Sequence, residues 1–307
     1  MKISPSLTTT GADIAPDDSL TRFVLDHSGV RGVIVRLGNT WQTIRGNGSY
    51  PSAIAELLGQ VCAATALFTG HTKIDGMLSV QLRGDGPIRM LFSECTGAGQ
   101  LRAIARFDEP LPPNIGPRDL GSSALLAITI ESTPPGGHEP TRYQGLVGLD
   151  ADTLAQAFEG YFDRSEQLPT RIALAADSRQ SVGLMIQQLP SSKSDPDGWN
   201  RASLLFDTVT RDDLLDTQDG ALLHRLYHED GVRILGQRSL AFACSCSRHR
   251  VAAVLTQLGH EEALAAVVEG GQARVTCEFC HQVYCFDRID IEALFSNSAG
   301  PSSAGLQ

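Results

Sequence analysis

Two close pairs of cysteines stand near the C-terminal end of the chain, Cys244 with Cys246 and Cys277 with Cys280. A four-thiolate zinc site needs two such pairs on segments that can fold back on each other, because each pair supplies adjacent corners of a tetrahedron. Once one sulfur of a pair has bound the metal, the second adds little ordering cost. The spacing therefore predicts a closed Zn²⁺ site at these four cysteines.

The same sulfurs allow two interpretations, an inert zinc clip or a switch. Residues 240–295 are too few for a strong core, and bound zinc can contribute roughly 10–16 kcal/mol to folding, so loss of zinc should unfold them. Thiolates next to Arg248, His249 and Arg250 can also react with oxidants. An oxidised cysteine with a neighbour two or three residues away forms a disulfide that no longer binds metal. Under the second interpretation, these cysteines form an oxidation-triggered folding switch.

The N-terminus and the cysteine content indicate a cytoplasmic protein. Residues 1–5 lead into a Ser/Thr-rich stretch without the apolar core of a secretory signal. Seven cysteines in such a chain favour metal binding or redox chemistry over structural disulfides. Cys62 falls beside the apolar stripe of a predicted helix, and we expect it and Cys95 to be small buried hydrophobic residues rather than nucleophiles.

The elements that must carry this site are predicted from periodicity. Apolar residues with a period of two predict strands at 33–37, 78–83, 88–92, 101–107, 124–130, 143–147, 174 and 183–189. Helical spacing predicts core-packing helices over 54–68 and 154–162, the second with Asp150 or Asp152 as N-cap. The stretch 54–68 is too short to cross a bilayer, so no membrane segment is expected.

These elements predict an α+β fold with a strand-rich N-terminal domain, a helical linker and a small C-terminal four-cysteine zinc domain. We expect a flexible extension (1–18), the N-terminal domain (19–190), the linker (191–239), the zinc domain (240–295) and a disordered tail (296–307). The linker carries short amphipathic helices with too little apolar area to stand alone. The alternative is that it forms a third part of the main core.

The charge of the 307-residue chain excludes one class of partner. The formal net charge is −10, and each predicted region is acidic by itself. Nucleic-acid binding normally requires a basic face that neutralises phosphates, so we expect no nucleic-acid partner.

Motifs spread over residues 19–295 resemble one family. Phe242–Arg248 with Val275–Cys280 and Tyr284–Asp287 closely resemble the redox-regulated chaperones called heat-shock protein 33. Further matching motifs lie upstream, at Gly29–Gly32, Gly84–Pro87, Tyr143–Gly145 and Tyr161–Thr170. The resemblance therefore does not depend on the cysteines alone.

The resemblance implies a holdase of the cytosol that is not an enzyme and works without ATP. The reduced, zinc-bound form would be inactive. Oxidative stress with unfolding conditions would expel zinc, melt the C-terminal domain and linker, and expose apolar surface for unfolding client proteins, and the oxidised form would tend to dimerise. Cys244, Cys246, Cys277 and Cys280 would then be both zinc ligands and redox sensors. No Gly-x-x-x-x-Gly-Lys-Ser/Thr loop is present, in agreement with ATP independence.

The redox disulfides expected from loop closure are Cys244–Cys246 and Cys277–Cys280. When the metal leaves and residues 247–276 unfold, closing a long loop costs more entropy than reaction between near neighbours. Cys285 leaves an alternative open, because it is close enough in sequence to capture Cys280. His281 is the other departure from the family pattern, which usually has glycine there, and either residue could alter the ligand set.

Two functions from other classes remain as alternatives. A zinc-ribbon nucleic-acid-binding protein would need the basic surface that the charges do not provide. A thiol oxidoreductase would use Cys277-Glu278-Phe279-Cys280 at a helix N-terminus, whereas the preceding residues 274–276 are β-like. Further ligands or bases are not expected among the histidines of the predicted C-terminal helices, which we interpret as solvated: His224, His228, His249 and His260.

Overall fold

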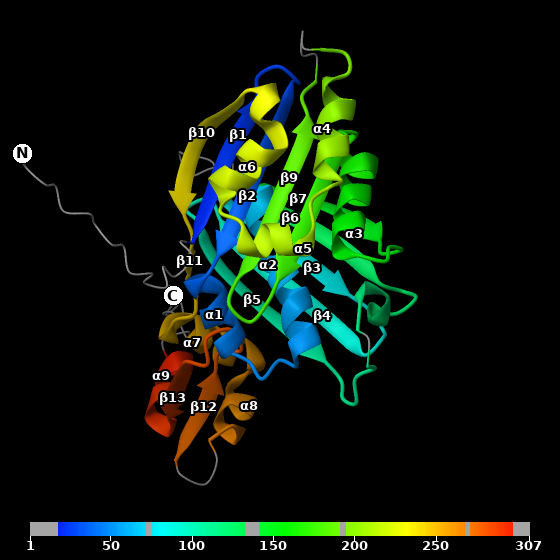
Figure 1. Cartoon of the computed structure of the whole chain (residues 1–307). Coiled ribbons are helices and arrows are strands. Elements are labelled where there is room, and N and C mark those ends of the chain that lie inside the picture. Colours follow the sequence, from blue (N-terminus) through cyan, green and yellow to red (C-terminus); the bar gives the residue numbers. More distant parts are fainter. Residues whose placement is uncertain are drawn as a thin grey trace, which may run out of the picture. The chain divides into compact units, whose positions relative to one another are not determined.

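The computed structural model describes residues 18–71, 75–113, 115–132, 141–190, 195–267 and 271–296. The predicted extension (1–18) and tail (296–307) lie outside these residues apart from Asp18 and Ser296. The described chain forms two compact units, which divide after Phe242. It is an α+β protein rich in strands, as predicted (Figure 1).

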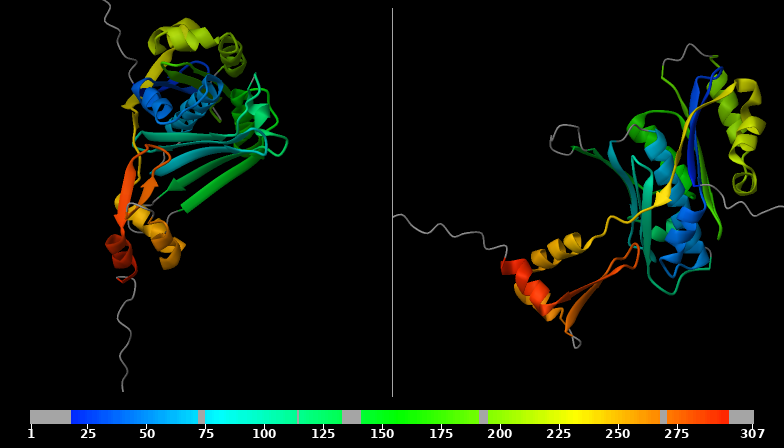
Figure 2. Two further views of the ribbon diagram at one scale, coloured as in Figure 1. Left: turned by 90° about the horizontal axis from the view of Figure 1, so that it is seen from below. Right: turned by 90° about the vertical axis from the view of Figure 1, so that its left-hand side faces the viewer.

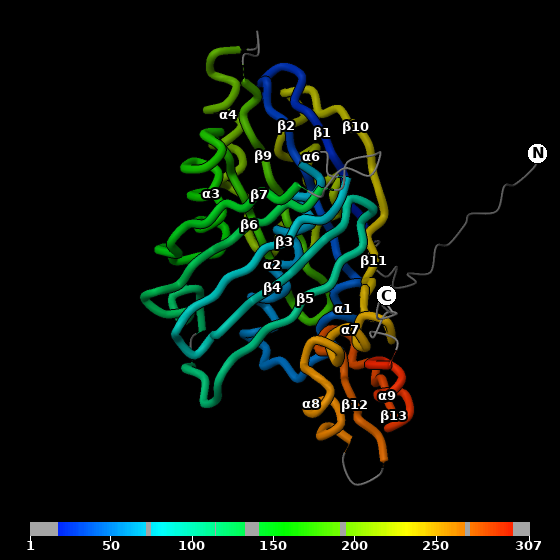
Figure 3. The backbone as a smooth tube through the Cα atoms, turned by 180° about the vertical axis from the view of Figure 1, so that it is seen from behind, coloured from blue at the N-terminus to red at the C-terminus, as the bar shows by residue number. Residues whose placement is uncertain are grey.

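The described residues of the first unit form two sheets of mostly antiparallel strands. One has the strand order β10-β1-β2-β9-β8 and the other β11-β5-β4-β3-β6-β7. The strands of the first sheet are β1 (Ser19–Leu25), β2 (Val30–Leu37), β8 (Thr170–Ala176), β9 (Ser181–Gln188) and β10 (Val232–Ser239). Those of the second are β3 (Gly76–Arg83), β4 (Ile88–Thr96), β5 (Gln100–Phe107), β6 (Leu125–Ser132), β7 (Thr141–Gly148) and β11 (Ala241–Phe242). Figure 3 shows the second sheet from behind.

Helix α2 (Ser52–His71) fills the space between the two sheets. Its side chains pack against strands of both sheets, and the shared core includes Leu58, Val61 and Leu67. The helix has 20 residues, more than the predicted 54–68, and is long and apolar enough to cross a membrane by composition. Because 83% of its most apolar window is buried inside the fold, we interpret it as a core helix.

Two further helices complete the core between the sheets. Asp18 accepts hydrogen bonds from the amides of Gly38 and Thr40 and so holds the start of α1 (Asn39–Gly46). Helix α3 (Leu154–Tyr161) continues into a π-helical turn, Phe162–Glu166. Its N-cap is Thr153, whose hydroxyl accepts from the amide of Gln156, and not Asp150 or Asp152 as predicted. Gln156 is the third residue of the helix, where a capping box requires Glu or Gln to bond back to the N-cap residue.

Three short helices cover the outer face of the first sheet (Figure 2), namely α4 (Gly198–Phe206), α5 (Arg211–Asp216) and α6 (Asp219–Tyr227). Their buried residues, such as Phe206, Leu222 and Tyr227, pack on Phe23 and Ile34 of the sheet. The prediction that the linker (191–239) is helical is wrong at its C-terminal end, because Val232–Ser239 form strand β10. This strand has no apolar face. Its backbone hydrogen bonds to the edge of β1 hold it in the sheet instead.

The second unit has a small core around a hairpin. Strands β12 (Gln272–Thr276) and β13 (Val283–Asp287) pair in antiparallel register and pack with α7 (Arg248–Leu258), α8 (His260–Ala265) and α9 (Arg288–Ser296). On α7, Leu255 is buried, whereas Val254 and Leu258 are 54% and 55% exposed. The core of this unit is therefore small.

Candidate metal centre

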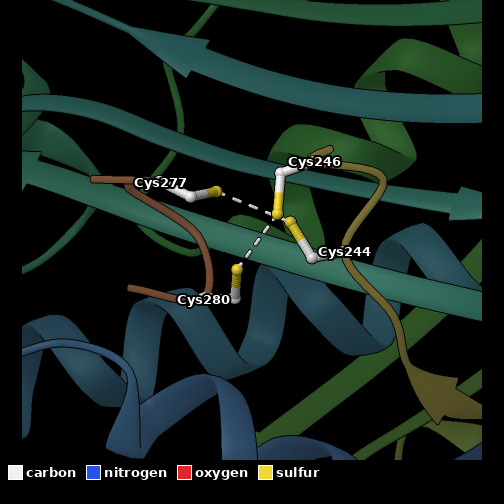
Figure 4. A group of neighbouring side chains, drawn as sticks. All are labelled: Cys244, Cys246, Cys277 and Cys280. Carbon is white, nitrogen blue, oxygen red and sulfur yellow. Dashed lines mark hydrogen bonds between the residues drawn. The ribbon is translucent and has the colours of Figure 1, made fainter. Parts of the chain in front are cut away.

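The four predicted site cysteines come from two segments of the second unit and meet at one point. Cys244 and Cys246 lie just before α7, whereas Cys277 and Cys280 lie in the turn between β12 and β13 (Figure 4). Their sulfur atoms all lie within 4.8 Å of one another. Across the two segments, Cys244 Sγ lies 3.6 Å from Cys277 Sγ, and Cys246 Sγ lies 3.3 Å from Cys280 Sγ.

The local backbone explains why the two pairs point inward. Cys277 N donates to Gln282 O at 2.9 Å, and His281 N donates to Cys277 O at 2.9 Å, which closes a tight turn around the second pair. His281 has a left-handed backbone with φ of 57°. Glycine would reach this region without the steric cost that a side chain pays there.

The first pair is placed by the start of α7. The Ser247 hydroxyl accepts a hydrogen bond of 3.2 Å from the Arg250 amide and so caps the helix directly after Cys246. The positive end of the helix dipole therefore lies beside this pair and favours negative charge there. Arg248 does not pair with the sulfurs, because its guanidinium bonds Asp290 at 2.7 Å and lies 4.2 Å from the Phe286 ring centroid.

The cluster is electrostatically unfavourable for free thiolates. Burial, and then the adjacent sulfurs of Cys246, Cys244 and Cys277, raise the pKa of Cys280 to about 12. Burial and the thiol of Cys244 also raise the pKa of Cys277, against backbone amide bonds that lower it. A bound cation reverses this effect, because its charge stabilises the thiolate form of every ligand. The four sulfurs therefore lie close enough together to hold one metal ion.

Neither of the two unusual neighbouring residues belongs to the cluster. His281 is exposed and Cys285 is half-buried, and the group that could hold a metal contains neither of them. Cys285 follows Tyr284 on β13, so the two side chains point to opposite faces of the hairpin. Tyr284 is the one that reaches the site, where its hydroxyl donates a hydrogen bond of 3.1 Å to Cys246 Sγ. The sequence analysis did not predict this bond.

The other predicted residues lie where expected. Cys62 and Cys95 are completely buried in the core of the first unit, and burial raises the pKa of the Cys62 thiol to about 12. Both are therefore inert buried residues, as predicted. His224, His228, His249 and His260 are exposed.

The fold and the site together define a two-unit α+β protein with a four-thiol cluster in its smaller unit. A family model described as Hsp33 protein matches residues 18–287. The chain belongs to the Hsp33 family.

Similar proteins cover almost the whole chain. A 33 kDa chaperonin of Pseudomonas fluorescens (strain SBW25) is 39% identical over 293 residues, which cover 93% of this chain and 96% of that protein. The 33 kDa chaperonin of Shewanella sediminis is 38% identical, and the match covers 98% of that protein. The crystal structure of the Hsp33 homologue of Thermotoga maritima matches with a TM-score of 0.75 at 20% identity, over 92% of this chain and 99% of that chain. This last match supports the fold.

Proposed function

We propose that the chain is a redox-regulated, ATP-independent holdase chaperone of the cytoplasm. In this proposal residues 19–190 form the chaperone domain, 191–239 the linker and 240–295 the redox-switch domain. The observation that carries it is the meeting of four sulfurs from two segments of a small unit, in a chain of the Hsp33 family. The curated relatives are named chaperonins, which supports binding of unfolded client proteins.

The donor set fits zinc. Zn–S bonds of about 2.3 Å place tetrahedral sulfurs about 3.8 Å apart, and the sulfurs here lie within 4.8 Å of one another. Four thiolates also complete the coordination and leave no open position for hydrolysis. Bound zinc would supply the positive charge that keeps the sulfurs deprotonated and ties the two segments together. Cys244, Cys246, Cys277 and Cys280 would hold it.

Oxidation would convert the ligands into two disulfides, Cys244–Cys246 and Cys277–Cys280. With hydrogen peroxide as oxidant, one thiolate attacks a peroxide oxygen and becomes a sulfenic acid, while the O–O bond breaks and water leaves after protonation. The neighbouring thiolate then attacks that sulfur and expels hydroxide, which takes a proton to become water. Two electrons pass from sulfur to peroxide for each disulfide. Neither product sulfur retains the negative charge that binds metal.

Loss of the metal would expose apolar surface in two steps. The second unit has a core with few large residues, among them Leu255 and Phe286, and depends on the metal for stability. Helices α4–α6 are short, and isolated helices under about 12 residues are marginal in water. Once they are released, their apolar faces and the sheet residues below them, such as Phe23 and Ile34, would become available to clients. The same surface would allow two oxidised chains to associate as a homodimer.

The test is suppression of light scattering by a heat-labile protein. Chain that is oxidised with peroxide at raised temperature should suppress aggregation without ATP, whereas reduced, zinc-loaded chain should not. Cys285→Ser should behave like the wild type, and Cys246→Ser should lose the dependence on the oxidant. Equal suppression in both states would mean that zinc is an inert clip. Turnover of a disulfide substrate would favour a thiol oxidoreductase instead.

A further inference from the structure

The first unit contains a cavity of about 420 Å³ that the cysteine chemistry does not use. It lies between α2, α3 and the strands of the second sheet. Apolar residues form most of its lining, with Phe68 from α2, Leu78 from β3, and Ile128 and Ile130 from β6. Small-molecule sites usually have this volume and an apolar wall with a few fixed polar groups.

Aromatic rings build one wall of this cavity. The Phe162 ring lies 5.1 Å from that of Phe68 and 5.6 Å from that of Tyr161, both edge-on. A Cβ at Gly145 would lie 2.5 Å from the Tyr161 hydroxyl oxygen, so the glycine lets this ring lie against β7. Edge-on aromatic pairs of this kind are favourable and help to hold the rings in this arrangement.

Arg31 of β2 supplies the fixed polar group. Its Nε and Nη2 donate to Gln187 Oε1 at 3.2 and 2.6 Å, and Nη2 also donates to His71 Nε2 at 2.8 Å. Gln187 is itself held in place, because its Nε2 donates to Thr170 Oγ1 at 2.9 Å. The guanidinium is therefore positioned before any ligand arrives.

The charge of Arg31 is not balanced by any carboxylate in the described part of the chain. Both of its acceptors are neutral, because burial and the charge of Arg31 lower the pKa of His71 to about 3. Among the described residues, Arg31 forms no ion pair, and its Nη1 has no hydrogen-bond partner. Glu166 also lines the cavity, but it is exposed and does not pair with Arg31. A half-buried cation without a counter-ion is costly, and an anionic ligand would relieve that cost.

We propose that this cavity binds an apolar monocarboxylate, with its carboxylate on Arg31 and its apolar body against Phe68, Phe162 and the β6 residues. A hydrogen bond from a guanidinium N–H to a carboxylate is strengthened by both charges, and the N–H groups of Nη1 are available to donate it. Binding uses the reduced, zinc-loaded chain and needs no client-binding surface. The site is therefore separate from the proposed chaperone function.

The test is calorimetric titration of the reduced, zinc-loaded full chain with octanoate, octan-1-ol and octylamine. We expect one octanoate per chain, and affinity for the alcohol and the amine that is at least about tenfold weaker. Arg31→Gln should weaken octanoate binding by about tenfold or more. Ile130→Trp, which fills the cavity from β6, should remove binding. Arg83→Gln, at an exposed arginine of β3 outside the cavity, is the matched control and should bind as the wild type does.

Several outcomes would overturn this site. Equal affinity for octanoate and octan-1-ol would mean that Arg31 is not a carboxylate receptor. Unchanged octanoate binding in both Arg31→Gln and Ile130→Trp would place the ligand elsewhere, and absence of binding at millimolar octanoate would leave the cavity without this function. Melting curves identify a variant that does not fold. If Arg31→Gln fails to fold, the proposal is tested by octanoate binding to Ile130→Trp and by the ratio of the wild-type affinities for octanoate and octan-1-ol.

Discussion

The hydroxyl of Tyr284 donates a hydrogen bond to Cys246 Sγ across 3.1 Å. This bond and then burial raise the pKa of Tyr284 to about 12, so the phenol remains a donor at neutral pH. Hydrogen bonds onto a ligand sulfur withdraw charge from it and fix its direction. Tyr284 therefore joins the β12–β13 hairpin to the segment that precedes α7.

We expect Tyr284→Phe to weaken zinc binding by about tenfold and to speed the reaction of Cys246 with peroxide several-fold. The reason is that a sulfur without its donor keeps more negative charge and a looser position. Competition with a chromophoric chelator measures the affinity, and stopped-flow zinc release measures the rate. Tyr143→Phe, at an exposed tyrosine of β7, is the control. Unchanged values for Tyr284→Phe would show that the bond does not act on the sulfur.

Arg36 of β2 holds the helical segment α4–α6 on the first sheet. Its guanidinium donates to the carbonyl oxygens of Leu214 and Thr217 at 3.0 and 2.8 Å and forms a 2.8 Å ion pair with Asp219. The side chain is only 11% exposed. Loss of such a group leaves buried acceptors without a partner, a cost of about 3 kcal/mol.

We therefore expect Arg36→Met to make residues 198–227 sensitive to proteases even in the reduced, zinc-loaded chain. Limited proteolysis with mass mapping measures this. Arg225→Met removes an exposed ion pair with Asp213 in the same segment and should cost under about 1 kcal/mol. If both variants resist cleavage as the wild type does, Arg36 does not control release of the segment.

Predicted strands such as β3 carry a clear periodic signal, which β10, one of the strands that were not predicted, lacks. Residues 78–83 alternate because only one face of β3 meets the core, and Leu78, Val80 and Leu82 are buried while their neighbours are not. In β10 the large residues Ile234 and Leu235 are both exposed, so no periodicity marks the strand. The position of β10 depends on the edge of β1, which lies more than 200 residues away in the sequence. A local sequence pattern therefore cannot predict it.

The site shows the same limit. Close pairs such as Cys277 and Cys280 predict a cluster because near neighbours in sequence remain near in space. The bond from Tyr284 depends instead on the register of the hairpin, which pairs Tyr284 with Val275, and on the fold of α7 against it. The contacts of Arg31 and Arg36 depend likewise on distant chain segments.

Metal removal should unfold the second unit and leave the first intact. The buried core of the second unit is small, whereas α2 is packed between two sheets. After chelation of zinc, the amides of β12 and β13 should exchange with solvent much faster, and those of α2 should not change. Hydrogen exchange with mass spectrometry follows both in one sample. Protection of β12 and β13 without metal would show that the unit folds by itself.

His71 should make the stability of the first unit depend on pH. Burial and the charge of Arg31 lower its pKa to about 3, whereas the unfolded chain binds this proton below about pH 6.5. Between these values the unfolded state holds more protons, so stability falls as pH falls. From pH 7.5 to 5.5 the loss is about 1.4 kcal/mol.

Denaturant melts across this range should show that loss in the wild type and less of it in His71→Gln, whose amide oxygen can still accept from Arg31. His27→Gln, at an exposed histidine of the β1–β2 turn, is the control and should keep the wild-type slope. An equal slope in His71→Gln would mean that His71 takes up a proton in the folded state.

The disulfide pattern reports whether the second unit unfolds before or after it is oxidised. In the folded site the sulfurs of the two segments are already in contact, at 3.3 Å for Cys246 with Cys280 and 3.6 Å for Cys244 with Cys277. Oxidation of the folded unit would therefore allow crosslinks between segments. Once the metal has left and residues 247–276 have unfolded, near neighbours react faster, because closing the long loop costs more entropy.

We expect Cys244–Cys246 and Cys277–Cys280 to dominate after peroxide treatment at raised temperature, and peptide mapping of the alkylated chain identifies them. Cys285 points to the opposite face of β13 from Tyr284 and can reach Cys280 only when the hairpin opens. A minor Cys280–Cys285 product should therefore rise with temperature and disappear in Cys285→Ser, which otherwise keeps the wild-type pattern. Dominant links between residues 244 or 246 and 277 or 280 would show instead that the unit is still folded when it is oxidised, which contradicts zinc release and unfolding as the trigger for closure of the local pairs.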